Sequence, residues 1–305
     1  MKKWFLLICT MVLVITLAAC GSDKTSGSDG NKGKITVGGK DFTEQQILTK
    51  MTSLYLKENG YDVEEADGMG STVVRKALEN GQIDLYWEYT GTALIVFLKQ
   101  DVVTDPDKAY ETVKEIDKKN GLLWLNKSDV NNSYAVLMRE DMAKELGIKS
   151  LEELADYVKK DASDLKFASN AEFFSREDGL IGLEKKYDFT FPKNNIVKMD
   201  NGLVLNALKE KQVQVSMGTT TDGRNKGFNL VVLEDNKQFF PPYNAVPVIR
   251  EEALKKYPEA KELLNKMAAK LNDETMRDLN YRVDVKHEDV TKVAQEWLTD
   301  NGFIK

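Results

Sequence analysis

The chain has 305 residues with a formal net charge of −6 at pH 7, and its only cysteines are Cys9 and Cys20. The acidic balance argues against nucleic acid as a partner, and the absence of cysteine after Cys20 excludes a disulfide, a cysteine metal site or a cysteine nucleophile from the main body of the chain. A body of this length must be stabilised by one large or two medium hydrophobic cores.

The N-terminus has the pattern of an export signal. Lys2 and Lys3 precede an apolar run, residues 4–19, that is too short to span a bilayer comfortably and that ends in Leu-Ala-Ala directly before Cys20. This ending resembles the bacterial lipobox, which implies a signal peptide of residues 1–19, lipid on the Cys20 thiol and a flexible tether to residue 33. We expect a protein anchored by this lipid to the extracytoplasmic face of the cell membrane. The alternative is a plain secretory signal with a chance cysteine.

Three strand–turn–helix units open the body. Strands are predicted at residues 35–37, 61–66 and 83–88, and helices are predicted to follow from Thr43, Ser71 and Ala93. Thr43 and Gln46 fit a capping box. Such units indicate an α/β domain with a largely parallel sheet, in which ligands lie beyond the carboxyl ends of the strands. Lys40, Ser71 and Tyr89 are all at such ends.

A second module of the same kind follows. A helix at 107–119 and a strand at 122–125 precede a longer strand, 131–138, that enters this module. Helices near 142–146 and 151–158, with Ser150 and Glu153 as a capping box, accompany strands at 165–168, 213–217 and 230–233. Residues 239–248 return the chain to the first module, and helices are predicted from 251 to 305. Crossings near Tyr134 and Tyr243 predict two hinged lobes with a cleft between them, namely 34–133 plus 246–305 and 134–245.

Enzyme chemistry finds little support in the sequence. There is no G-x-S-x-G elbow, no H-E-x-x-H motif and no metal-ligand spacing, and the single histidine, His287, lies in a polar stretch typical of a surface. We therefore expect no catalytic residue, no metal and no cofactor. A surface hydrolase that uses paired carboxylates stays open as the alternative class.

Six segments carry a family resemblance. They are 38–44 (GGKDFTE), 88–92 (EYTGT), 132–135 (NSYA), 172–179 (EFFSREDG), 221–224 (TDGR) and 239–243 (FFPPY). In this order they resemble the substrate-binding lipoproteins of osmoprotectant ABC importers, the glycine betaine/carnitine/choline (ProX and OpuC) group. The resemblance implies a two-lobed fold of the type II periplasmic-binding-protein class that closes on a quaternary amine. It also implies a monomer that delivers this solute to an ABC permease.

The resemblance also assigns ligand contacts. Tyr89, Tyr134 and Tyr243 match an aromatic cage, which suits a trimethylammonium group because that group has no N–H to donate. Four polar residues match the rest of the site. Arg176 and Lys40 would hold a carboxylate, and Thr92 and Asn132 would add hydrogen bonds.

One position departs from the family pattern. The family often has a fourth cage tyrosine where this chain has Thr219. Three alternatives stay open: Phe173 or Phe174 fills the gap, the cation is less enclosed, or the ligand is a bulkier betaine such as ergothioneine. Thr219 is itself expected to contact the ligand, where it would make room or supply a hydroxyl. Two further alternatives stay open: Tyr134 and Tyr243 pack only at the hinge, or the protein passes its ligand to a signalling partner. Arg176 is expected to head a helix, where its charge opposes the helix dipole.

Overall fold

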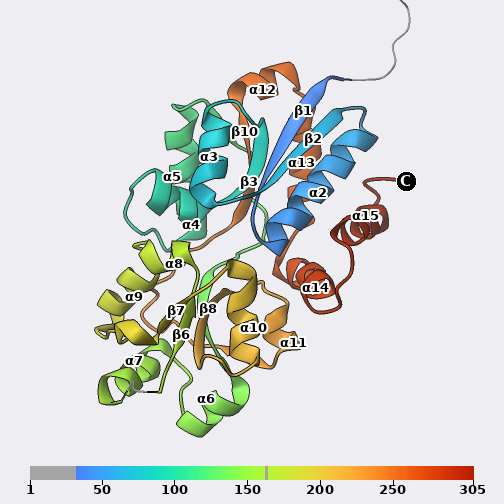
Figure 1. Ribbon diagram of the computed structural model, residues 1–305. Helices are drawn as coiled ribbons and strands as arrows, with labels where there is room; N and C mark the ends of the chain where they lie inside the picture. Colours follow the sequence, from blue (N-terminus) through green and yellow to red (C-terminus); the bar gives the residue numbers. More distant parts are fainter. Residues whose placement is uncertain (1–31, 162–163) are drawn as a thin grey trace, which may run out of the picture. The chain divides into compact units, whose positions relative to one another are not determined.

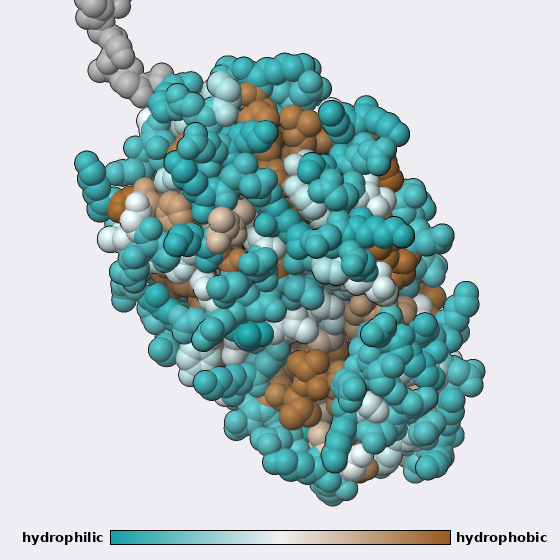
Figure 2. All heavy atoms as spheres, turned by 180° about the vertical axis from the view of Figure 1, so that it is seen from behind, coloured by the Kyte–Doolittle hydropathy of each residue, from teal (hydrophilic) through white to brown (hydrophobic). Residues whose placement is uncertain are grey.

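The computed structural model describes residues 32–161 and 164–305, and Lys32–Lys305 form one compact unit that contains two five-stranded sheets (Figure 1). The predicted signal peptide, Cys20 and nearly all of the tether lie outside the described residues. Within the described ranges, none of the helices has the length and apolar character needed to cross a bilayer. The face seen from behind is mainly hydrophilic, with hydrophobic residues in a few separate patches (Figure 2).

The first sheet has the strand order β2-β1-β3-β10-β4. Its strands are β1 (Lys34–Lys40), β2 (Asp62–Met69), β3 (Leu85–Tyr89), β4 (Leu122–Trp124) and β10 (Ala245–Arg250). The strands β1, β2 and β3 are parallel, as predicted, whereas β10 runs antiparallel to β3 and β4 because it returns from the second module. The carboxyl ends of β1 and β3 therefore lie at one edge of the sheet.

Helices cover both faces of the first sheet (Figure 1). On one face lie α2 (Thr43–Glu58), α13 (Ala260–Ala268), α14 (Asp273–Asp284) and α15 (Val290–Asp300). The other face carries α3 (Ser71–Glu79), α5 (Pro106–Lys118) and the short α4 (Thr90–Thr92), which continues as a π-helix over Ala93–Phe97. The helix α12 (Glu251–Lys256) follows β10. Because helices cover both faces, the central strands β3 and β10 are buried along almost their whole length, whereas the edge strand β2 is largely exposed or half-buried.

The second sheet has the order β7-β6-β8-β5-β9. Its strands are β5 (Tyr134–Arg139), β6 (Phe167–Ser169), β7 (Ile196–Lys198), β8 (Val215–Thr219) and β9 (Leu230–Val232). Its helices are α6 (Glu140–Leu146), α7 (Leu151–Lys160), α8 (Ala171–Ser175), α9 (Leu180–Tyr187), α10 (Val204–Lys209) and α11 (Arg224–Gly227), with 3₁₀ turns at Lys193–Asn195 and Asn201–Leu203. The sequence analysis missed β7, since this three-residue edge strand is only partly buried and has no clear alternation.

Two chain segments connect the sheets, one between β4 and β5 and the other between β9 and β10. They run side by side: the Asn132 N–H donates to the Tyr243 carbonyl at 3.1 Å, and the Tyr243 N–H donates to Asn131 Oδ1 at 2.7 Å. Two hydrogen-bonded crossings of this kind are the connectivity expected for a hinge.

The two predicted capping boxes have different outcomes. The box of Ser150 and Glu153 at α7 is confirmed by both of its reciprocal hydrogen bonds. The box predicted at Thr43 is wrong, because Phe42 is the N-cap residue and the Thr43 hydroxyl instead donates to Asp284 Oδ1 at 2.6 Å. A contact with α14, 241 residues away, has replaced the local cap.

Candidate ligand-binding site

A cavity of about 380 Å³ lies where residues from both sheets meet. All eight ligand contacts expected from the sequence line it: Lys40, Tyr89, Thr92, Asn132, Tyr134, Arg176, Thr219 and Tyr243. They come from the carboxyl ends of β1, β3 and β8, from α4, from the start of β5, from the two crossing segments and from the end of α8. The structure therefore brings together residues that are spread over more than 200 positions of the chain.

The aromatic side chains of the cavity form two pairs. The rings of Tyr134 and Tyr243 meet edge to face, with 5.3 Å between their centres. The ring of Tyr89 is stacked near Phe42, at 6.1 Å and an interplanar angle of 30°. Phe42 also lines the cavity, and the sequence analysis did not name it as a ligand contact. Both pairs can present ring faces to a bound cation.

Two of the phenol groups are tied to buried carboxylates. The Tyr89 hydroxyl donates to Glu44 Oε1 at 2.7 Å, and the Tyr243 hydroxyl donates to Asp178 Oδ2 at 2.6 Å. Burial, and then the neighbouring carboxylate, raises the pKa of both phenols well above the ordinary value, so they stay neutral. Because these hydroxyls are engaged, a ligand meets the ring faces and not the phenol oxygens.

Glu44 is the centre of the polar network beneath the rings. Its buried carboxylate accepts hydrogen bonds from Tyr89 Oη (2.7 Å), Asn132 Nδ2 (2.8 Å), Thr221 Oγ1 (2.6 Å) and Asn280 Nδ2 (3.2 Å). Burial raises the pKa of this carboxyl, and the four donors oppose that shift. The donors belong to β3, a crossing segment, the loop after β8 and α14, so one side chain links elements of both sheets.

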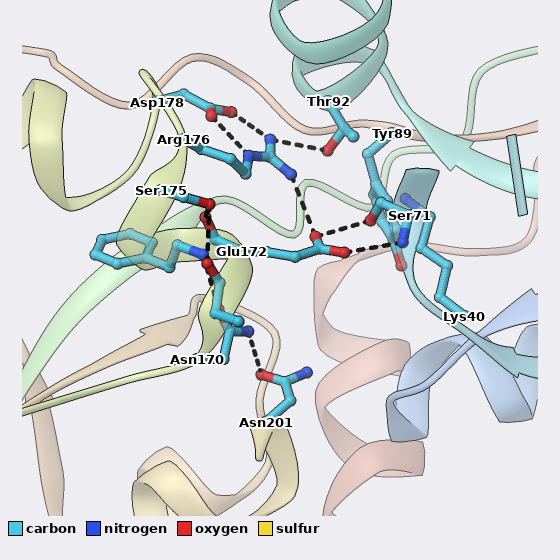
Figure 3. A network of polar contacts seen from close by, with 12 residues as sticks. Lys40, Ser71, Tyr89, Thr92, Asn170, Glu172, Ser175, Arg176, Asp178 and Asn201 are labelled. Atoms are coloured by element: carbon cyan, nitrogen blue, oxygen red, sulfur yellow. Dashed lines mark hydrogen bonds and ion pairs between the residues drawn. The ribbon is translucent and has the colours of Figure 1, made fainter. Parts of the chain in front are cut away.

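The two cations expected to hold a ligand carboxylate already have partners in the chain. Lys40 Nζ lies 2.5 Å from Glu88 Oε1, and both side chains are almost fully buried. The Arg176 guanidinium makes a two-point contact with Asp178, with 2.7 Å between Nε and Oδ1, and donates to Thr92 Oγ1 at 3.4 Å (Figure 3). Glu88 is 48 positions from Lys40, so their pairing has no local signal, whereas Asp178 is only two positions from Arg176 and could have been considered as its partner.

Arg176 also differs from its predicted position in a helix. It follows the last turn of α8 as the C-cap residue and does not head a helix. A positive charge at that end is favourable, so the expected conflict with the helix dipole does not arise. Its guanidinium carbon lies 5.2 Å from the centre of the Tyr134 ring, and Lys40 Nζ lies 5.1 Å from that of Tyr89. Two of the three predicted cage rings thus already face a cation of the chain.

Carboxylates outnumber cations among the side chains that line the cavity. The six acids are Asp41, Glu44, Glu172, Asp200, Asp222 and Asp284, whereas the bases are Lys40, Arg176 and Arg224. The crowding of carboxylates affects Asp41. The pKa of Asp41 is raised first by burial and then by the nearby charge of Glu172. A cavity with excess negative charge attracts cations and repels anions.

Comparison with known proteins assigns the chain to a family. Residues 33–300 match the OpuAC model, described as the substrate binding domain of ABC-type glycine betaine transport system. The chain belongs to the OpuAC family. A glycine-betaine-binding protein of Pseudomonas aeruginosa is 43% identical, over 88% of each chain. The carnitine transport binding protein OpuCC of Listeria monocytogenes is 34% identical, over 100% of this chain and 99% of that protein.

A solved structure confirms the predicted fold class of this OpuAC-family chain. It is titled a glycine betaine/carnitine/choline ABC transporter, is 30% identical, and superposes with a TM-score of 0.71 over 89% of this chain and 100% of that one. The type II periplasmic-binding-protein fold expected from the sequence is therefore confirmed.

The cavity wall around Thr219 has no added aromatic ring from α8. Phe173 is fully buried and packs edge-on against Tyr134 at 5.1 Å, while Phe174 lies under Lys198 Nζ. Neither phenylalanine lines the cavity, so the alternative in which one of them fills the gap is wrong. The aliphatic side chains that line the cavity from the second module are Ala171, Met199, Val204, Leu205 and Met217.

Gly91 in α4 is packed against the ring of Tyr243. A Cβ atom at this position would lie 2.8 Å from Tyr243 Cδ1 and Cε1 and 2.9 Å from the Pro242 carbonyl oxygen. We therefore predict that Gly91→Ala lowers the free energy of unfolding by about 1–3 kcal/mol, because the ring must shift. Urea denaturation checks this value.

Gly202→Ala is the matched control for Gly91→Ala. Gly202 lines the cavity, and a Cβ there meets no atom within 4 Å. A change of less than about 0.5 kcal/mol is expected for this variant. If the two variants are equally stable, close packing at Gly91 does not position the Tyr243 ring.

Proposed function

We propose that this chain is an extracytoplasmic, lipid-anchored solute-binding protein that captures a quaternary amine and delivers it to an ABC permease. The solutes in question are compatible solutes such as glycine betaine, carnitine and choline. The observation that carries the proposal is that Tyr89, Tyr134 and Tyr243 line one cavity in which carboxylates outnumber cations. The proposed anchor is a lipid on Cys20, and the proposed state is a monomer.

Binding a quaternary amine in this cavity has a simple physical basis. Each desolvated ring contributes up to about 2 kcal/mol to a cation, so three rings supply roughly 3–6 kcal/mol. Micromolar affinity needs about 8 kcal/mol. The excess of carboxylates and the contact with apolar walls are expected to supply the remainder.

We further propose that the ligand is enclosed between two lobes, 34–133 plus 246–305 and 134–245. The cavity draws residues from both ranges, and the paired crossings at Asn132 and Tyr243 provide a hinge. The hydrogen bond from Thr221 to Glu44 links the two ranges at 2.6 Å. Closure of this kind removes the cation from water, which strengthens its attraction to the rings.

A bulkier betaine, such as ergothioneine, is the second candidate ligand. Thr219 replaces an aromatic ring in the family pattern, and Met199, Val204, Leu205 and Met217 add apolar surface to the same cavity. The cavity of about 380 Å³ lies within the size range of pockets that hold drug-sized ligands, which are larger than glycine betaine.

Catalysis is not part of the proposal. The OpuAC family consists of transport substrate-binding domains, which are not enzymes. Within the part of the chain that the structure describes, no three acidic or histidine side chains are grouped to hold a metal ion. Reversible, stoichiometric binding with recovery of unchanged ligand is therefore expected, and turnover of a quaternary-amine ester would contradict it.

Titration calorimetry with glycine betaine, carnitine, choline and ergothioneine tests the ligand class. At least one should bind with one-to-one stoichiometry, and the absence of binding by all four would refute the class. We predict that Tyr134→Ala weakens this binding by about 10–30-fold, because one ring is lost from the cage.

Tyr134→Phe is the matched control for the alanine variant, because it keeps the ring and removes only the hydroxyl. Its affinity should stay within about threefold of the wild type. Thermal unfolding of both variants separates loss of the ring from loss of the fold. Equal affinities of Tyr134→Ala and the wild type would show that Tyr134 only packs at the hinge.

A further inference from the structure

Glu172 bridges the two modules across the cavity. It lies in α8, beside the second sheet, and its carboxylate accepts hydrogen bonds from the backbone N–H and the hydroxyl of Ser71 at 2.9 and 3.0 Å (Figure 3). Ser71 is the first residue of α3, which packs on the first sheet. Both residues line the same cavity as the aromatic rings. The contact is therefore part of the ligand site and not of a distant surface.

The N-terminus of α3 receives its acceptor from Glu172. The N-cap residue, Gly70, has no side chain to offer, and the first turn of this nine-residue helix contains no acidic residue. The free N–H groups and the positive end of the helix dipole favour a negatively charged acceptor. A carboxylate 101 positions away in the sequence fills that role. This end of the cavity is thus shaped to hold a carboxylate group.

The carboxylate of a zwitterionic betaine needs the same kind of partners. Few partners for a ligand carboxylate are free around the cavity. Lys40 is paired with Glu88, and Arg176 is paired with Asp178. The remaining guanidinium nitrogen of Arg176, Nη1, lies 3.6 Å from Glu172 Oε2. Glu172 therefore occupies both the helix N-terminus and the open side of the guanidinium.

Of the three carboxylates Glu88, Asp178 and Glu172, it is Glu172 that is accessible from the cavity. Its side chain is 38% exposed, whereas those of Glu88 and Asp178 are fully buried. A ligand carboxylate brought to this end would lie next to a negative charge, and it can displace the Glu172 carboxylate more readily than either buried one. A ligand with a neutral hydroxyl at the same end meets no such repulsion.

We propose that Glu172 sets the charge selectivity of the cavity. Its carboxylate competes with that of a zwitterionic betaine for the Ser71 donors and for Arg176, and so weakens betaines relative to choline. This inference rests on the proposed function, since it assumes a quaternary amine in the cavity. It makes Glu172 a specificity-determining residue that favours a cationic ligand over a zwitterionic one.

The test compares glycine betaine and choline on the wild type and on Glu172→Gln by titration calorimetry. The amide keeps an oxygen that can accept from Ser71 but removes the charge. Glycine betaine should bind at least tenfold more tightly to Glu172→Gln, while choline should bind equally or up to threefold more weakly. Glu172→Ala, which removes the acceptor as well, should change the ratio of the two affinities in the same direction.

Glu177→Gln is the matched control. Glu177 follows Arg176, is exposed and does not line the cavity, so loss of its charge should leave the ratio unchanged. If Glu172→Gln weakens both ligands by the same factor, Glu172 only holds the modules together and the proposal is overturned. An unchanged ratio overturns it as well. If the wild type binds neither glycine betaine nor choline, the proposed function fails as well. That result differs from the outcomes above, in which the wild type binds a ligand and only the proposal about Glu172 fails.

Discussion

Glu44→Ala is expected to abolish measurable binding of quaternary amines and to lower the free energy of unfolding by about 2–4 kcal/mol. The estimate assigns about 1 kcal/mol to each of the four hydrogen bonds that the Glu44 carboxylate accepts. Binding is lost because Tyr89 loses the acceptor for its hydroxyl and Thr221 loses its link to α2. Urea denaturation and calorimetry measure the two effects.

Glu58→Ala is the control for Glu44→Ala. Glu58 ends the same helix, α2, but is exposed, so a change of less than about 0.5 kcal/mol and unaltered binding are expected. Wild-type stability together with wild-type affinity in Glu44→Ala would show that the network does not position the cage.

The pH dependence of stability gives Glu44 a second signature. Because the pKa of Glu44 is raised in the folded state, the folded protein binds this proton more tightly than the unfolded chain. The resulting stabilisation is complete below the ordinary glutamate pKa and is lost as the pH rises through the raised value. The wild type should therefore gain stability relative to Glu44→Gln as the pH falls from 7 through that interval.

The strand ends and the aromatic contacts were predictable from the sequence because their signals are local. Alternating apolar residues mark β3, and a Thr-Gly-Thr turn marks its end, so Tyr89 falls at the carboxyl edge of the sheet. Tyr134 and Tyr243 were found by their motifs, and the structure places all three tyrosines on one cavity.

Partners distant in sequence were not predictable. The contact of Lys40 with Glu88 depends on the pairing of β1 and β3, and that of Tyr243 with Asp178 depends on the return crossing. Glu44 and Glu172 lie within the motifs that carry the family resemblance, but a motif does not show which of its members face the cavity. Sequence reasoning therefore assigned the carboxylate-binding role to Lys40 and Arg176 without the acids that neutralise them.

The surroundings of Thr219, where the family often has a tyrosine, could be described only with the structure. Thr219 ends β8, opposite Tyr134 in the register of β5 and β8, so a ring at this position would lie beside Tyr134. In the first module, the ring of Phe42 stacks near Tyr89. The four rings at the cavity are thus divided equally between residues 34–133, with Phe42 and Tyr89, and residues 134–245, with Tyr134 and Tyr243.

Asp178→Ala is the second substitution with a large expected effect. Asp178 is fully buried, makes two contacts with the Arg176 guanidinium and accepts the Tyr243 hydroxyl at 2.6 Å. Removing it leaves a buried charge without its main partner, which costs about 3–5 kcal/mol of folding free energy. Affinity for a quaternary amine should fall more than tenfold, because both Arg176 and the Tyr243 ring lose their positions. Urea denaturation and calorimetry measure these changes.

A double-mutant cycle separates the buried pair from the packing around it. Arg176→Ala combined with Asp178→Ala should be less destabilised than the sum of the single variants, because no charge is then left unpaired. Glu262→Ala is the exposed control: Glu262 lies 2.9 Å from Lys266 with 75% of its side chain exposed, and its loss should leave the stability close to that of the wild type. Additive effects at Arg176 and Asp178 would show that the two side chains contribute independently, and the cage would then not depend on this pair for its position.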